Sequence, residues 1–292
     1  MPWLPWFVST ACALVLALVG ITAFGQRRWA ARVLALQRTL EAGRVDAGPA
    51  ATALPTRYDA RELDGLPAPV QRYFRTVLKD GQPIITAAWI DTEGRFSLSP
   101  TAAQWKPFAA RQRVITRRPG FLWDARISML PGVTVRVVDS YIAGRGLLRA
   151  AVQGLFSMAA LQGDGEVARG EFMRWFAEAA WYPTALLPSQ GTQWQAVDDR
   201  SARATAADGP IRLTLLFSFN DAGLISAFRA EARGAMVGRQ MVMAPWEGSW
   251  SNYQAHDGVM VPCTGEVAWM RDGARRPYFV GAVTALKFEC SP

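Results

Sequence analysis

The stretch GEVARGEFMRWFAEAAWYPTALLP, residues 165–188, decides the fold. It carries the only long helical pattern in a region whose other segments alternate with the two-residue period of strands. Glycines precede the stretch and Pro183 ends it, which predicts a helix over residues 166–181. A helix this apolar, alone among strands, is expected to lie against the inside of a curved sheet.

The predicted helix has two unlike faces. Its polar face carries Glu171, Arg174 and Glu178, and Arg174 lies at ion-pair spacing from both acids, so we interpret this face first as a salt-bridged stripe. Two alternatives stay open: acid–base catalysis by the two carboxylates, and binding of a polar headgroup. At about 100° per residue, the broad apolar face contains Ala168, Phe172, Met173, Trp175, Phe176, Ala179 and Ala180.

Short alternating segments separated by turn residues surround this helix on both sides. In the clearest of them, Ile211, Leu213, Leu215, Phe217 and Phe219 share one face. Strands joined by tight turns predict an antiparallel sheet, as two meanders packed about the helix. The expected strands are 84–91, 94–98, 111–117, 121–129, 133–141, 147–156, 193–197, 201–206, 211–220, 224–233, 241–254, 259–269 and 278–289, with a short helix at 67–78.

The N-terminal segment 3–24 carries no charge. At about 1.5 Å per residue it is roughly 33 Å long as a helix, enough to cross a bilayer core of about 30 Å. Its length and the absence of preceding Lys or Arg favour a membrane anchor over a cleaved signal peptide, although residues 23–25 (Ala-Phe-Gly) form a tolerable cleavage site. Five arginines follow at residues 27–44, so the positive-inside rule predicts a cytoplasmic domain, with the periplasmic side left open.

These features predict three parts: a transmembrane anchor over 1–28, a juxtamembrane segment and linker over 29–56, and one β domain over 57–292. The linker prediction rests on the Ala/Pro/Gly-rich stretch 43–56. The net charge of +8 is not concentrated on one element of the β domain, so nucleic acid is not an expected partner. The sequence leaves the oligomeric state open.

Motifs for metal, cofactor or nucleophilic chemistry are missing from the sequence. The three cysteines, Cys12, Cys263 and Cys290, form no CxxC, and a single histidine rules out the usual zinc sets. That histidine, His256, stands at the turn before Asp257 and Gly258, so we interpret it as a turn residue. Cys263 and Cys290 lie on adjacent predicted strands but at distant register positions, which predicts two free thiols. No cofactor or metal is expected.

Three strings carry a resemblance to known proteins: the helical stretch 165–188, PWEG at 245–248, and VPCTGEVAW at 261–269. Over about residues 60–290 the chain resembles a bacterial family of unknown function whose members typically have an N-terminal membrane segment. The AEAxWYPTALLP core is the specific part of this resemblance. It implies a fold similar to the half-barrel of bacterial lipoprotein carriers, in which a curved antiparallel sheet covers a helix. It implies no activity and no catalytic residues.

The aromatic content gives the sharpest functional hypothesis. An apolar cavity between sheet and helix would suit a lipid or another hydrophobic ligand. We therefore favour a non-enzymatic role in binding such a ligand, with two rivals: a hydrolase that uses Glu171 or Glu178, and a structural or interaction domain with a solid core. The predicted lining is Trp123, Phe172, Trp175, Phe176, Trp181 and Trp246, with Trp181 and Tyr182 at the mouth and Glu171, Arg174 and Glu178 as the polar contacts.

Overall fold

The computed structural model describes residues 3–45, 54–97, 104–238 and 240–291. Its helices and 3-10 turns are α1 (Trp3–Val45), η1 (Ala60–Leu63), α3 (Ala68–Val77), α4 (Glu166–Ala177), η2 (Glu178–Trp181), η3 (Pro183–Leu186) and η4 (Pro188–Gln190). Its strands are β1 (Ile85–Ser97), β2 (Trp105–Ile115), β3 (Gly120–Leu130), β4 (Val133–Ile142), β5 (Arg145–Val152), β6 (Phe156–Gly163), β7 (Gln193–Asp198), β8 (Ser201–Asp208), β9 (Ile211–Phe219), β10 (Ile225–Val237), β11 (Gln240–His256), β12 (Val259–Arg271) and β13 (Ala274–Cys290).

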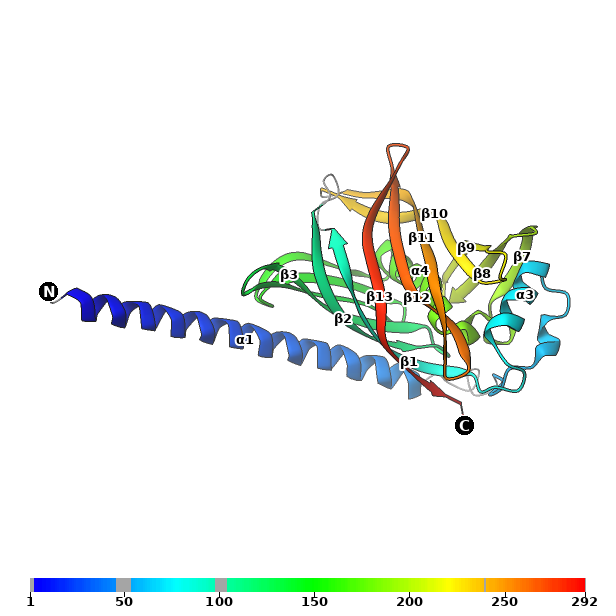
Figure 1. The fold of residues 1–292 in the computed structure, drawn as a ribbon, viewed down its shortest axis with the longest axis horizontal. Coiled ribbons are helices and arrows are strands. Elements are labelled where there is room, and N and C mark those ends of the chain that lie inside the picture. The colour runs from blue at the N-terminus through cyan, green and yellow to red at the C-terminus, as the bar shows by residue number, and fades with distance from the viewer. Residues whose placement is uncertain (1–2, 46–53, 98–103, 239, 292) are drawn as a thin grey trace.

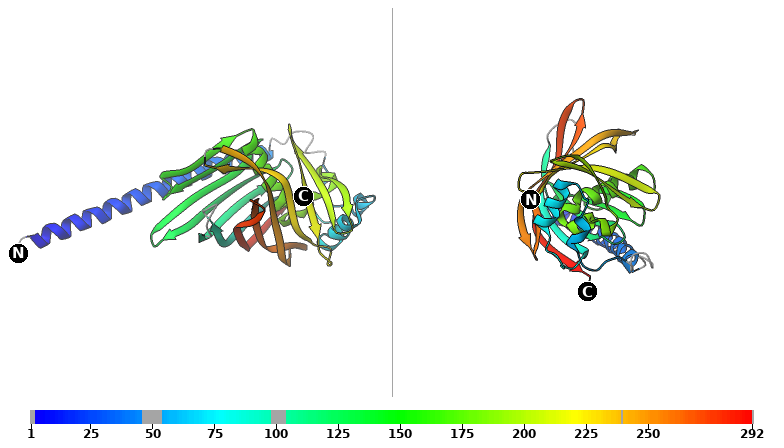
Figure 2. Two further views of the ribbon diagram at one scale, coloured as in Figure 1. Left: turned by 90° about the horizontal axis from the view of Figure 1, so that it is seen from above. Right: turned by 90° about the vertical axis from the view of Figure 1, so that its right-hand side faces the viewer.

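The strands form one antiparallel sheet in the order β6-β5-β4-β3-β2-β1-β13-β12-β11-β10-β9-β8-β7. Each half is a meander, and the first and last strands of the chain join the two halves at the centre. The sheet curves around α4 without closing (Figures 1 and 2). This arrangement confirms the predicted curved antiparallel half-barrel around a central helix, which begins at residue 166 and passes into the 3-10 turn η2 at Glu178.

Two strand predictions were wrong. The segments 84–91 and 94–98, expected as separate strands, belong to the single strand β1, because Thr92 and Glu93 form no turn and pair with β2 in unbroken register; Leu98 lies outside the described residues. The segment 147–156 spans two strands, β5 and β6, because Gln153 and Gly154 adopt positive φ and form a tight turn. The strand β6 was not predicted as an element of its own.

The main core lies between the concave face of the sheet and α4. Phe172 stacks against Tyr141 of β4 at 5.2 Å between ring centroids, and Phe176 meets Phe217 of β9 edge-on at 5.9 Å. At one end of the barrel the amphipathic helix α3 covers the core with Val70, Tyr73, Phe74 and Val77, all buried. The 3-10 turns after α4 fill the same end, so the barrel is closed there.

A second core lies on the convex face, under the C-terminal half of α1. The helix runs without a break to Val45, and Trp29 and Leu40 are buried against Ile115, Leu122 and Val138 of the sheet. The Trp29 indole N–H donates to Asp124 Oδ1 at 2.9 Å. Most of the segment expected as a juxtamembrane connection is therefore helix packed on the domain, and residues 46–53 of the expected linker lie outside the described residues.

The strand registers direct six hairpin tips to the same end of the sheet. These tips join β1–β2, β3–β4, β5–β6, β8–β9, β10–β11 and β12–β13, and they point away from the end that α3 covers. Glycines allow the sheet to bend at its centre, where Gly94, Gly281 and Gly265 stand side by side on three strands. A Cβ on Gly94 would lie 2.0 Å from the Val280 carbonyl oxygen, so position 94 has no room for a side chain.

The described residues contain three free cysteines, which agrees with the predicted thiols. Thr264 pairs with Ala282, so Cys290 lies several positions beyond the partner of Cys263, as the turn at Asp272 and Gly273 predicted.

Candidate functional site

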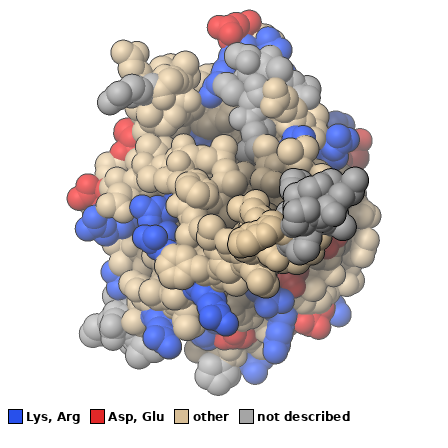
Figure 3. Space-filling view, turned by 90° about the vertical axis from the view of Figure 1, so that its left-hand side faces the viewer, with Lys and Arg blue, Asp and Glu red and all other residues tan. Residues whose placement is uncertain are grey.

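A pocket of about 830 Å³ lies between the sheet and α4, on the side of the helix that faces the hairpin tips. Aromatic and aliphatic side chains from ten strands form most of its wall. The β1–β2, β10–β11 and β12–β13 hairpins contribute Ser97, Trp105, Met241 and Arg271 at the open end. Figure 3, viewed along α1 from its N-terminal side, shows a hollow in this end of the molecule.

Arg174 of α4 organises the polar side of the pocket. Its guanidinium donates to Asp139 Oδ2 of β4 at 2.6 Å and to Glu178 Oε1 at 2.7 Å. It also lies over the Trp123 ring, 4.8 Å from the centroid. Gln112 of β2 donates to the other Glu178 oxygen at 2.7 Å. Each Glu178 oxygen thus accepts one hydrogen bond, and the two bonds fix the orientation of the carboxylate.

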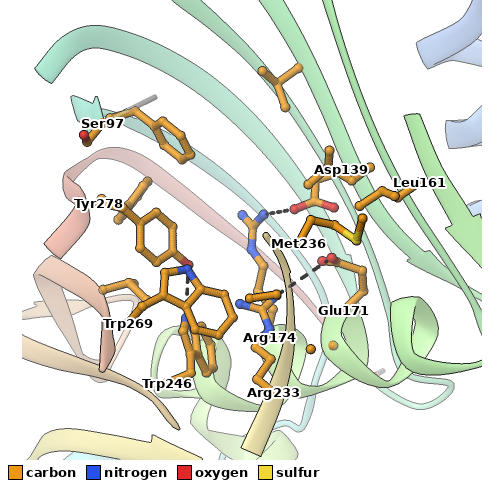
Figure 4. Close-up of a pocket in the computed structure, with 18 of the residues that line it drawn as sticks. Ser97, Asp139, Leu161, Glu171, Arg174, Arg233, Met236, Trp246, Trp269 and Tyr278 are labelled. Carbon is orange, nitrogen blue, oxygen red and sulfur yellow. Dashed lines mark hydrogen bonds and ion pairs between the residues drawn. The ribbon is translucent and has the colours of Figure 1, made fainter. Parts of the chain in front are cut away.

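Glu171 and Arg233 form a second, looser pair beside the first (Figure 4). Arg233 Nη2 lies 3.8 Å from Glu171 Oε1, and both residues are buried. Burial and the nearby Asp139 carboxylate raise the pKa of Glu171 well above its ordinary value. Asp139 Oδ1 and Glu171 Oε2 have no hydrogen-bond partner among the described residues, and the closeness of the two side chains adds to the rise in the pKa of Glu171.

An aromatic wall faces these charged groups from β11, β12 and β13. The Arg233 guanidinium lies 4.3 Å from the Trp246 ring centroid and 5.6 Å from that of Trp269. Trp246 Nε1 donates to the Tyr278 hydroxyl at 3.0 Å, which fixes the ring (Figure 4). The wall therefore pairs a large apolar surface with a buried cation.

Six of the ten residues proposed from the sequence line this pocket: Trp123, Glu171, Arg174, Glu178, Trp181 and Trp246. The other four, Phe172, Trp175, Phe176 and Tyr182, are buried in the core. Trp175 Nε1 donates to the Ile115 carbonyl oxygen at 3.0 Å, and the Tyr182 hydroxyl donates to the Trp175 carbonyl oxygen at 2.5 Å. The helix thus directs its polar face into the pocket and its aromatic face against the sheet.

The expected mouth at Trp181 and Tyr182 differs from the structure. Tyr182 is fully buried at the closed end of the barrel, and Trp181 lies at the base of the pocket with its indole N–H on the Pro262 carbonyl oxygen at 2.9 Å. The reason is that α3 and η3 cover the end of the helix, which leaves the hairpin tips as the open end.

Five residues of the site were not predicted from the sequence: Gln112, Asp139, Arg233, Trp269 and Tyr278. A signal existed for two of them: Asp139 follows Val133, Val135 and Val137 on the inward face of its strand, and Gln112 stands between inward-facing Ala110 and Val114. A polar residue on an apolar strand face marks a buried polar site. Arg233 gave no such signal, because a register shift between Ala230 and Arg233 changes which positions of β10 face inward.

Within the described residues, no group of three or more His, Cys, Asp or Glu side chains is placed to hold a metal ion. The ion pairs within the pocket instead join Arg174 to Asp139 and Glu178, and Arg233 to Glu171. Their arrangement can hydrogen-bond a polar group of a ligand, with the aromatic wall covering its apolar part.

Comparison with known proteins yields one family. The model of a family described as "Family of unknown function (DUF6920)" matches residues 64–288. No curated protein matches the chain. A crystal structure of a LolA superfamily protein from Nitrosomonas europaea is similar with a TM-score of 0.39 and 9% identity, covering 77% of this chain and 93% of that one. A beta-barrel-like protein with domain of unknown function DUF1849 from Brucella abortus is similar with a TM-score of 0.22 and 9% identity, covering 70% and 99%.

Proposed function

The chain belongs to the family of unknown function DUF6920, and we propose from its own geometry that it is a membrane-anchored protein that binds a hydrophobic ligand, such as a lipid, in the pocket between sheet and α4. The observation that supports this proposal is the pocket itself. About 830 Å³ lies within the usual range of ligand sites, roughly 300–1,000 Å³, and most of the wall is apolar. A filled-core scaffold would leave no such space.

The pocket favours binding over hydrolysis. Glu178 is bound through both carboxylate oxygens, and Glu171 is placed to hydrogen-bond to Asp139. These carboxylates hold Arg174 and Arg233 against aromatic rings. They are suited to fixing the polar part of a ligand.

Membrane anchoring by α1 is the second part of the proposal. The helix has one apolar segment long enough to cross a membrane, near its N-terminus, and little of that segment is buried against the domain. A signal sequence has the same length and composition. In favour of an anchor, the same continuous helix packs Trp29 and Leu40 into the second core, so its C-terminal half is part of the folded domain.

Native mass spectrometry of residues 25–292 tests ligand binding. We expect the protein to carry a hydrophobic molecule from the expression host. Val137→Trp places a large ring in the pocket wall and should yield the apo mass, whereas the matched change Val197→Trp, on an exposed side chain of β7 outside the pocket, should keep the adduct. An apo mass for the unmodified protein, with no uptake of offered lipid, would refute the proposal.

A further inference from the structure

The helix α1 leaves the β domain at the open end of the pocket. Its C-terminal part packs at the closed end, where Leu40 contacts Gly120, and Gly25 packs at the opposite end, where it contacts Gln153 and Leu155 of the β5–β6 tip. Residues 8–24 are exposed apart from half-buried Thr22, and Gly25 is the first buried residue. The uncharged run 3–24 therefore projects past the hairpin tips (Figure 1).

Exposed apolar side chains collect at this same end. Among the described residues of the β domain, eight large hydrophobic side chains are exposed, and seven of them lie on or beside the hairpin tips; only Val197 does not. Phe156 and Leu130 are each 67% exposed, and Met158 and Met241 also line the pocket. Clustered apolar side chains on an otherwise polar surface mark a contact with a protein or a membrane.

Basic side chains lie next to the exit of the helix. Arg28 and Arg32 of α1 are close enough to each other, and Arg32 to Arg149 of β5, for their charges to repel. Within the described part of the chain, none of these three arginines forms an ion pair. Arg28 and Arg32 follow Gly25 by three and seven residues, or about 5–10 Å along the helix axis. If the apolar segment that ends at Phe24 crosses the bilayer core, side chains at this distance from its end lie in the headgroup layer.

We propose that the hairpin-tip end of the domain rests on the bilayer that α1 crosses, with Leu130, Phe156 and the Met158–Met241 side of the pocket at the headgroup boundary. The pocket then opens toward the lipid, and a ligand passes between leaflet and pocket without crossing water. The partner is an anionic bilayer surface, because the apolar tips and the unpaired arginines lie at the same level. This inference rests on the proposed anchoring by α1.

The experiment uses the full chain with Cys12, Cys263 and Cys290 replaced by serine and one new cysteine labelled with the environment-sensitive dye NBD. The sites are Phe156→Cys at the tips, Val197→Cys as the matched exposed apolar control at the far end, and Leu16→Cys within the apolar run. Each protein is reconstituted into phosphatidylcholine–phosphatidylglycerol vesicles, with or without lipids that carry a doxyl quencher.

We expect the dyes at positions 16 and 156 to emit at shorter wavelength and to be quenched by the doxyl lipids, and the dye at 197 to remain unquenched. Quenching at 16 without quenching at 156 would show that the domain stands away from the membrane, and would overturn this inference while leaving the anchor and the pocket intact. No quenching at 16 would overturn the anchoring on which it rests. Ligand binding by residues 25–292 is measured separately, so its failure is distinguishable from both results.

Discussion

Arg113 of β2 donates its Nε–H to Glu41 Oε1 of α1 at 2.6 Å, across the boundary between the helix and the convex face of the sheet. The Arg113 side chain is only 3% exposed, and its Nη1 donates to Glu289 Oε1 of β13 at 2.7 Å. The hydrogen bond from Arg113 helps to hold the pKa of Glu289 below its ordinary value. One buried guanidinium thus connects the helix to the strands at the centre of the sheet.

Glu41→Ala should destabilise the domain, because it leaves the buried Arg113 with one carboxylate instead of two. We expect a loss of about 1–3 kcal/mol in the free energy of unfolding, the usual range for a buried polar group that loses a partner. Chemical denaturation measures it. Asp221→Ala, which removes the exposed Arg200–Asp221 pair, is the control and should leave the midpoint unchanged. Equal effects of the two substitutions would contradict the role of Arg113.

Removal of residues 1–24 should leave the melting temperature of the domain unchanged, because those described side chains make almost no buried contact with it. Removal of residues 1–44 should lower it strongly, since the second core loses Trp29 and Leu40 and exposes Ile115, Leu122 and Val138. Circular dichroism melts of both forms check this. Two equally stable forms would show that α1 adds nothing to the fold.

Glu171 should make the protein less stable as the pH rises. Burial and Asp139 raise its pKa in the folded state, so the folded protein holds this proton more tightly than the unfolded chain. The stabilising contribution of Glu171 is complete below pH 4.5, the pKa of this side chain in the unfolded chain. It is lost as the pH rises through the higher pKa of the folded state. Glu171→Gln, which cannot ionise, should match the parent near pH 4 and exceed its stability at pH 8.

The control for this comparison is Glu231→Gln, on a side chain that is 77% exposed. Melting curves of the three proteins between pH 4 and 8 give the result. A Glu171→Gln protein that is less stable than the parent at pH 8 would show that the ionised carboxylate stabilises the fold through Arg233.

Trp175→Ala should act on stability more than on ligand occupancy. The ring is buried between Phe172 and Tyr182, and its indole N–H donates to Ile115 in the core outside the pocket. Truncation of a buried tryptophan costs about 3–5 kcal/mol. Trp269→Ala is the matched pocket-wall variant and should lower the ligand adduct with a smaller change in melting temperature. The reverse pattern would place the ligand against Trp175.

The sequence predicted the fold well because its strongest patterns are local. Ile211 to Phe219 alternate as a strand must, and the segment 166–181 has a continuous apolar face. Contacts between segments far apart in the sequence were harder to predict. Nothing in the periodicity of residues 29–45 shows that this segment packs on the convex face, since that requires knowing that Asp124 and Glu289 stand there to receive Trp29 and Arg44.

The candidate site shows the same contrast between local features, which the sequence predicts, and long-range contacts, which it does not. The Arg174–Glu178 pair at 2.7 Å is one of the two intrahelical pairs predicted from the sequence, whereas Glu171 pairs with Arg233 instead of Arg174. The partners that aim the polar face of the helix into the pocket come from strands distant in sequence, Asp139 and Arg233. A one-residue irregularity of β10 places Arg233 inside, and single-sequence alternation does not reveal such shifts.

The pairing of β1 with β13 has a consequence for how the chain folds. Ile85 pairs with Cys290, so the centre of the sheet is the strand pairing with the largest sequence separation. Strands β1 to β6 leave the ribosome with one edge of β1 unpaired, and that edge stays open until β13 has been synthesised. Non-local pairing of this kind slows folding and exposes an edge to aggregation. Truncation of β13 should therefore abolish assembly of the whole half-barrel, because this strand joins the two meanders of the sheet.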